Sequence, residues 1–188
     1  RLQTIVAREL DPAVTAVVTV GSLQAGTKSN IIPASATLLA NVRTFDEKVR
    51  EHVLASIERI VRAECDAAGA GQAPTFEYYD RFPLTVNDPE VTTHLTEEFT
   101  RAFGRPPMDP GPGTGSEDFG LIGDAFGVPY CYWFFGSSDP EKFAAAIAAG
   151  TFGRDIPGNH SPHFAPLLQP TLDRGVEAAV VALCSYLD

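Results

Sequence analysis

The sequence predicts a fold of the α/β (α+β) class. Strand patterns and helix patterns alternate along the chain, and they fall into two successive parts. Residues 16–20 form a short β-branched run, and residues 36–43 alternate between two faces, as strands do. Longer segments repeat apolar residues at helical spacing, which indicates amphipathic helices. Composition and rhythm change at residues 83–88, where a proline follows the last aromatic run. We therefore expect a linker over residues 83–88 between two units.

The first unit is expected to start with a helix over residues 2–10, where apolar side chains recur at helical spacing. Asp11-Pro12 ends that helix. The strand over residues 16–20 should then pass into a polar, glycine-containing loop at Gly21. The next strand occupies residues 36–43.

A long helix is expected after the second strand, because Asp46 can cap it and Gly69 can end it. Residues 75–82, with aromatic residues on both faces, predict a last strand. This order is that of a ferredoxin-like α/β plait without its first strand, which would lie centrally in the sheet. We therefore expect the chain to begin inside a longer sequence. The helix should bury one stripe, formed by Val49, Val53, Ile57, Ile60 and Val61.

The second unit is expected to be half of an α/β domain with helices that cover a sheet. Residues 89–104 predict an amphipathic helix that Gly104 closes, and residues 141–149 a short alanine-rich helix. The continuously apolar residues 128–135 are typical of a buried strand. A final helix over residues 170–187 should bury Val176, Val180, Leu183 and Leu187.

The charge balance disfavours two classes of partner. There are 14 Lys and Arg against 24 Asp and Glu, a net charge of -10, which repels nucleic acid and anionic membranes. No apolar run reaches the roughly 20 residues that span a bilayer, and the first residues lack the pattern of a signal peptide. Three widely spaced cysteines indicate reduced thiols. We therefore expect a cytoplasmic protein that binds neither nucleic acid nor membrane.

Several polar residues are candidates for a binding site. His160 lies in a compact turn that Pro162 keeps from forming a helix, so it is a candidate metal ligand, although a loop histidine is more often a surface residue. Asn30 and Arg43 flank the second strand and could together clamp a carboxylate at one end of the sheet. Arg43 could instead pair with Asp46.

A glycine-rich loop and two carboxylates precede residue 120. Gly113-Thr114-Gly115 lacks the Walker pattern and its lysine, which disfavours a nucleotide site. Ser116 lacks the flanking sequence of a nucleophile elbow, which disfavours a serine hydrolase. Glu117 and Asp118 stand just before an expected helix and could equally be capping residues.

Taken together, these motifs resemble those of the M20 metallopeptidase and amidohydrolase family. They occur in the family's order over essentially the whole chain, and the Ser-Glu-Asp-Phe form is most similar to the aminoacylase, hippurate hydrolase and indole-acetyl-amino-acid hydrolase branch. The motifs are Asn30-Ile-Ile-Pro33, Val42-Arg43-Thr44, Asn87-Asp88, Gly115-Ser116-Glu117-Asp118-Phe119 and His160-Ser161-Pro162.

The resemblance implies a fold and a set of roles. Residues 1–84 would be most of a lid and dimerisation domain, and residues 85–188 the C-terminal part of an α/β metallohydrolase domain. His160 would complete one metal's ligand shell. Asn30 and Arg43 would reach the substrate carboxylate, often in the partner subunit's site, Gly115 and Ser116 would line the substrate site, and Glu117 and Asp118 would support it.

The implied activity is hydrolysis of the amide bond of N-acyl amino acids, or of related small peptides and conjugates, with two divalent ions such as zinc or manganese. The general base and the other metal ligands would lie upstream of this chain, which alone should be inactive. A homodimer formed through the lid is expected. The alternative is a non-catalytic module for dimerisation and ligand binding.

Overall fold

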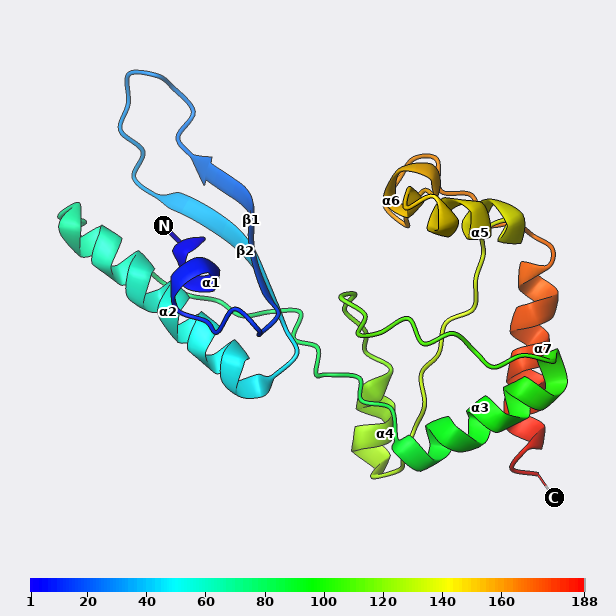
Figure 1. The fold of residues 1–188 in the computed structure, drawn as a ribbon. Helices are drawn as coiled ribbons and strands as arrows, with labels where there is room; N and C mark the ends of the chain where they lie inside the picture. Colours follow the sequence, from blue (N-terminus) through cyan, green and yellow to red (C-terminus); the bar gives the residue numbers. More distant parts are fainter. Residues whose placement is uncertain (188) are drawn as a thin grey trace. The chain divides into compact units, whose positions relative to one another are not determined.

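The computed structural model describes residues 1–187 and divides the chain into two compact units (Figure 1). Unit 1 comprises Arg1–Leu84 together with the short stretch Thr114–Glu117. Unit 2 comprises Thr85–Gly113 and the residues from Asp118 onward. Both strands lie in unit 1, and most of the helices lie in unit 2, so the chain is of mixed α and β class.

The sheet of unit 1 is an antiparallel pair, β1 (Ala16–Ala25) and β2 (Ala36–Thr44), in which Val18 lies opposite Val42. The expectation that β1 gives way to a loop at Gly21 is wrong. A bulge between Val20 and Ser22 shifts the register, and pairing continues to Ala25. The bulge places an extra residue in one strand without ending the ladder.

Two helices pack on this hairpin, α1 (Thr4–Arg8) and α2 (Glu47–Ala67). Asp46 caps α2 as expected, because its Oδ1 accepts a hydrogen bond of 2.9 Å from the Val49 N–H. The apolar stripe expected on α2 is confirmed. Its residues join one core, which contains Leu2, Ile5, Val18, Val53 and Ile60, with Val42, Val49, Ile57 and Val61 packed against it.

Residues 75–82 form no strand, so that expectation is wrong. The segment instead contacts α2: the Tyr78 hydroxyl donates a hydrogen bond of 2.6 Å to Glu58, and the Arg62 guanidinium lies over the Phe76 ring. The physical reason is that a strand needs a neighbour, and the only sheet in the described residues is the β1–β2 pair. The described residues contain no further strand with which this segment could pair.

Unit 2 contains five helices among its described residues: α3 (Pro89–Phe103), α4 (Gly120–Phe126), α5 (Pro140–Ala148), α6 (Phe152–Asp155) and α7 (Thr171–Cys184). The sequence anticipated α3, α5 and α7 and a helix just after Asp118, which is α4, but α6 was not expected. Gly104 ends α3 in the left-handed conformation, as predicted. The stripe of α3 packs against α7 in a core of Leu95, Phe99 and Ala178, joined by Val91 and Phe103.

The segment 128–135 was expected to be a buried strand, and no strand is present there. Its side chains nevertheless alternate as in a strand. Cys131 and Trp133 contact Thr92 and Phe99 of α3. Tyr130 and Tyr132 contact Phe119 on the other side. The segment thus has the side-chain pattern of a strand but lacks a neighbouring strand with which to form a ladder.

The expectation that α7 buries its stripe of Val176, Val180, Leu183 and Leu187 is also wrong. Val176 is 63% exposed and Leu183 64%, and Val180 and Leu187 are similarly uncovered. The helix uses its other face, centred on Ala178, to pack on α3. No other segment within residues 1–187 buries the Val176 stripe. Within the same residues, no helix has both the length and the apolar content that a membrane crossing requires.

Glu9 connects α1 to α2 through its carboxylate. It accepts hydrogen bonds from the buried Ser56 hydroxyl at 2.9 Å and from the Arg59 guanidinium at 2.6 Å. His52 Nε2 lies 4.0 Å from the same carboxylate. The bonds from Arg59 and Ser56 stabilise the ionised form, so they lower the pKa of Glu9 below its ordinary value.

We therefore predict that unit 1 loses stability when Glu9 is protonated. The pKa of Glu9 is lower in the folded state than in the unfolded state. The stabilisation is therefore fully present at a pH above the unfolded-state pKa, and it is lost as the pH falls through the folded-state pKa. In wild type, the free energy of unfolding should fall as the pH becomes acidic. Glu9→Gln should make that fall smaller, as measured by urea unfolding between neutral and acidic pH. Glu64→Gln, at an exposed pair with Arg1, is the control and should leave the curve unchanged. An unaltered acid branch in Glu9→Gln would contradict the role of this carboxylate.

Candidate functional site

Arg43 lies one residue before the end of β2, with an exposed side chain. Its Nε donates a hydrogen bond of 3.0 Å to Asn41 Oδ1, and its Nη1 donates to the backbone carbonyl of Thr114. The alternative pairing with Asp46 is wrong. The Asp46 carboxylate caps α2, and no ion pair in the described chain joins it to Arg43.

The loop that contains Gly115 and Ser116 lies beside Arg43, because Thr114–Glu117 belong to unit 1. Gly115 and Ser116 are exposed, and Glu117 is half-buried. Asp118 begins the return to unit 2, where its carbonyl accepts a hydrogen bond of 3.0 Å from Leu121 N–H at the start of α4. The structure thus brings together a guanidinium and the exposed backbone of a glycine-containing loop. Such a combination can bind an anion.

Asn30 lies in the turn that precedes β2, and Arg43 lies near the other end of that strand. Arg43 lies seven steps along the strand from Ala36, which at about 3.3 Å a step amounts to about 23 Å. The expectation that Asn30 and Arg43 lie at one end of the sheet is therefore wrong. A fully paired strand cannot shorten, so these two residues of one chain do not contact the same small carboxylate.

His160 occupies the compact turn that the sequence predicts. Ser161 N–H donates to the Gly158 carbonyl at 2.9 Å, and Phe164 N–H donates to the Ser161 carbonyl at 3.0 Å. The side chain of His160 is exposed. Residues 1–187 contain no cluster of three or more His, Cys, Asp or Glu side chains suited to a metal ion. His160 can therefore supply one ligand, and the described residues do not complete a metal site around it.

The structure reveals a role for Asn87 that the sequence did not. Its side-chain amide donates a hydrogen bond of 2.8 Å to the Tyr132 carbonyl and accepts one of 2.7 Å from the Tyr132 N–H. The next residue, Asp88, caps α3 by accepting from Glu90 and Val91 N–H groups, each at 3.0 Å. The Asn87-Asp88 motif was a usable signal, but its partner is 45 residues away in the sequence and could not be identified.

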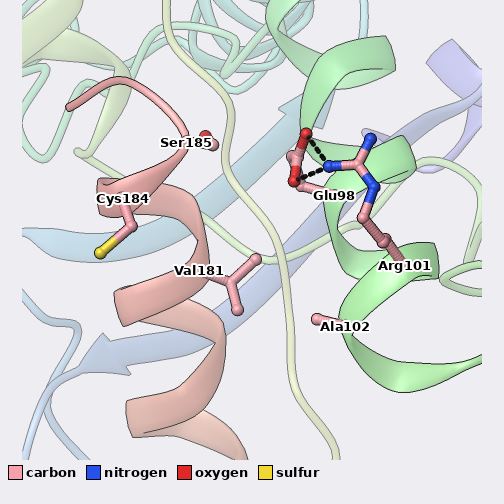
Figure 2. Close-up of a pocket in the computed structure, with 6 residues that line it drawn as sticks. All are labelled: Glu98, Arg101, Ala102, Val181, Cys184 and Ser185. Carbon is pink, nitrogen blue, oxygen red and sulfur yellow. Dashed lines mark hydrogen bonds and ion pairs between the residues drawn. The ribbon is translucent and has the colours of Figure 1, made fainter. Parts of the chain in front are cut away.

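One pocket in unit 2 contains none of the predicted site residues. It is a hollow of about 290 Å³ between α3 and α7. Figure 2 shows that Arg101 points toward Glu98 on the same helix, α3, while the Cys184 sulfur points away from both. The two charged side chains of the lining pair with each other, and the Ser185 hydroxyl donates a hydrogen bond of 2.9 Å to the Ala182 carbonyl.

Comparison with known proteins gives this geometry a context. Residues 9–68, which run from the end of α1 to the end of α2, match the peptidase dimerisation domain. A solved structure from Bacillus subtilis, described as a dinuclear metal binding peptidase from the M20 family, superposes with a TM-score of 0.63 at 25% sequence identity. That superposition covers 92% of this chain and 42% of the other. The chain contains an M20 peptidase dimerisation domain.

Two further relatives of this chain are hydrolases by name. Thermostable carboxypeptidase 2 of Saccharolobus solfataricus is 33% identical over 138 residues, which cover 73% of this chain and 34% of that protein. N-acetylcysteine deacetylase of Bacillus subtilis is 30% identical over 142 residues, which cover 76% of this chain and 36% of that protein. The chain spans about a third of the length of the curated relatives that it matches.

Proposed function

We propose that this chain is part of an M20 amidohydrolase that cleaves the amide bond of N-acyl amino acids or related small conjugates. In this reaction water adds across the amide: the acyl carbon gains the hydroxyl oxygen, the C–N bond breaks, and the nitrogen leaves as the amine of the free amino acid. Amide cleavage is the reaction that the names of the deacetylase and carboxypeptidase relatives imply for those proteins. Residues 1–84 act as the lid and dimerisation part, and residues 85–188 as part of the catalytic domain.

The observation that carries this proposal is the position of the Arg43 guanidinium beside the Gly115–Ser116 loop. Arg43 binds the substrate carboxylate, and the exposed backbone of Gly115 and Ser116 lines the substrate site. The hydrogen bond to Thr114 is replaced or supplemented when a carboxylate enters, because a guanidinium has five donors in a planar fork. Glu117 and Asp118 support the loop from its C-terminal side.

Asn30 serves the site of a partner subunit in this proposal. It cannot share a carboxylate with Arg43 of its own chain, since the length of β2 separates them. A homodimer formed through unit 1 removes that difficulty, because the loop at the end of the hairpin can extend into the partner. The match of residues 9–68 to a peptidase dimerisation domain supports this arrangement.

His160 supplies one imidazole ligand to a site for two divalent ions, with zinc or manganese as the expected metals. An imidazole in an ordered, exposed turn fits that role, and the metal-binding relative supports it. When bound, such ions polarise the acyl carbonyl and make water acidic. The remaining ligands and the general base, a glutamate by resemblance, come from other residues of the complete protein.

A non-catalytic module for dimerisation and ligand binding is the second candidate. The observation that favours it is the dimerisation match, which covers much of unit 1. The two candidates differ in one measurement, which is metal-dependent release of free amino acid by the complete protein. A cytoplasmic location stays a prediction of the sequence.

We predict that Arg43→Lys in the complete protein lowers kcat/KM for an acetylated amino acid by about tenfold or more. Lysine keeps the charge but loses the fork, and a guanidinium–carboxylate contact contributes about 1.5 to 3 kcal/mol. Steady-state kinetics should show little change for an analogue with a neutral amide in place of the carboxylate. Arg101→Lys, at an exposed pair with Glu98, is the matched control. Equal losses on both substrates would make Arg43 structural.

We predict that His160→Ala removes most activity and lowers metal content, while the melting temperature changes little. Loss of one ligand weakens one metal site without removing a core contact, because His160 is exposed. Metal analysis and turnover are measured on the same sample. His163→Ala, in the same turn, should behave like wild type. Full metal occupancy and wild-type turnover in His160→Ala would refute its assignment as a ligand.

We predict that residues 1–188 alone do not hydrolyse acetylated or benzoylated amino acids at any metal concentration. The described residues gather no metal cluster, and His160 is their only proposed ligand. The assay uses the purified chain with added zinc or manganese. Metal-dependent turnover by this chain would mean that its site is built from other residues.

A further inference from the structure

The Ser-Glu-Asp-Phe motif ends in an aromatic residue, Phe119, that packs within unit 2. The Phe119 ring lies 5.7 Å from the Tyr130 ring and 5.3 Å from the Tyr132 ring, centroid to centroid. Tyr130 and Tyr132 are two residues apart in an extended segment, so their side chains emerge on the same face. Phe119 therefore packs on a surface made by one segment, and the position of that segment determines where Phe119 lies.

Two glycines extend the same contact into α4. A Cβ on Gly120 would lie 2.7 Å from the Tyr130 hydroxyl oxygen, and a Cβ on Gly123 would overlap the Tyr130 ring itself. Both glycines are buried. The backbone of α4 thus lies directly on the tyrosine ring, at a distance that other residues do not permit. We call Phe119, Gly120, Gly123, Tyr130 and Tyr132 the aromatic seat.

The segment that forms the aromatic seat is held by Asn87. The Asn87 side-chain amide forms hydrogen bonds with both the backbone N–H and the backbone C=O of Tyr132, so it satisfies one donor and one acceptor of extended backbone. Asp88 N–H donates to the Tyr130 carbonyl at 2.8 Å, and Val86 N–H donates to the Tyr130 hydroxyl at 3.1 Å. Residues 86–88 thus take the place of a neighbouring strand.

We propose that Asn87 is a positioning residue for the substrate loop. Its two hydrogen bonds hold the backbone of Tyr132 in place. Phe119 packs on the Tyr130 and Tyr132 rings. Phe119 in turn positions the C-terminal end of the loop that contains Gly115 and Ser116. This inference rests on the proposed function of that loop. Asn87 acts through the aromatic seat and contacts no proposed substrate-binding side chain, which distinguishes it from Arg43.

The test uses the complete protein and two variants that disturb the aromatic seat from opposite sides. Asn87→Leu removes both hydrogen bonds at similar side-chain size. Gly123→Ala places a methyl group in the Tyr130 ring. The matched control for the second is Gly153→Ala in α6, where an added Cβ meets nothing within 4 Å. All are assayed well below their melting temperatures for kcat/KM, metal content and amide hydrogen exchange.

Each seat variant should lower kcat/KM by about 10- to 100-fold, because small displacements of a binding group cost rates of that order. The double variant should lose less than the product of the two single losses, since both release the same seat. Asn87→Leu combined with Arg43→Lys should lose about the full product. Metal content and the Gly153→Ala control should match wild type. A loss in Asn87→Leu no larger than in the control would overturn the proposal.

Hydrogen exchange separates this inference from the proposed function. In Asn87→Leu, the amides of residues 115–119 should exchange faster, while those of α2 should not change. If wild type proves inactive on every N-acyl amino acid, the proposed function fails, and exchange still decides whether Asn87 orders the loop. Unchanged exchange at residues 115–119 would overturn the positioning role. If Asn87→Leu fails to fold, Gly123→Ala serves for both measurements.

Discussion

Extended backbone must find hydrogen-bond partners along its edges, and this requirement governs both units. In unit 1, β1 and β2 satisfy each other along a ladder that tolerates a bulge. In unit 2, the residues around Tyr132 have no neighbouring strand, and the Asn87 side chain supplies a donor and an acceptor instead. A side chain that hydrogen-bonds both the N–H and the C=O of one residue fixes the position of that residue, which packing alone would leave less well defined. Helix α3 packs on this segment through the contact between the Phe99 and Trp133 rings.

Electrostatics limits how such a protein could recognise an anionic substrate. A net charge of -10 repels a carboxylate at long range, but the Debye length of about 8 Å at physiological salt screens most of that repulsion. Attraction therefore has to be local and directional. Arg43 is suited to this, because Asn41 and the Thr114 carbonyl hold its guanidinium while the side chain stays exposed. Its orientation is thereby restricted before a ligand arrives, which lowers the entropy cost of binding.

The candidate site was predicted in part. The order of its motifs indicated a resemblance to the M20 family, and the turn that holds His160 was visible from Pro162. The separation of Asn30 from Arg43 was missed, although the length of the intervening strand was available in the sequence. The role of Asn87 could not be found from the chain alone, because Tyr132 carries no feature that marks it as a partner for an amide 45 residues earlier. The roles of Gly115, Ser116, Glu117 and Asp118 stay predictions.

The sequence by itself determined the elements whose signals are local. Helix α2 follows from the Asp46 cap and its apolar stripe, and α3 follows from its stripe and Gly104, because capping and periodicity act within a few residues. Tertiary structure decided the fate of residues 75–82 and 128–135. Both have strand-like sequences, but a strand exists only where another backbone pairs with it. It likewise decided that α7 buries Ala178 and leaves the Val176 stripe exposed, since an apolar stripe is buried only where another surface lies against it.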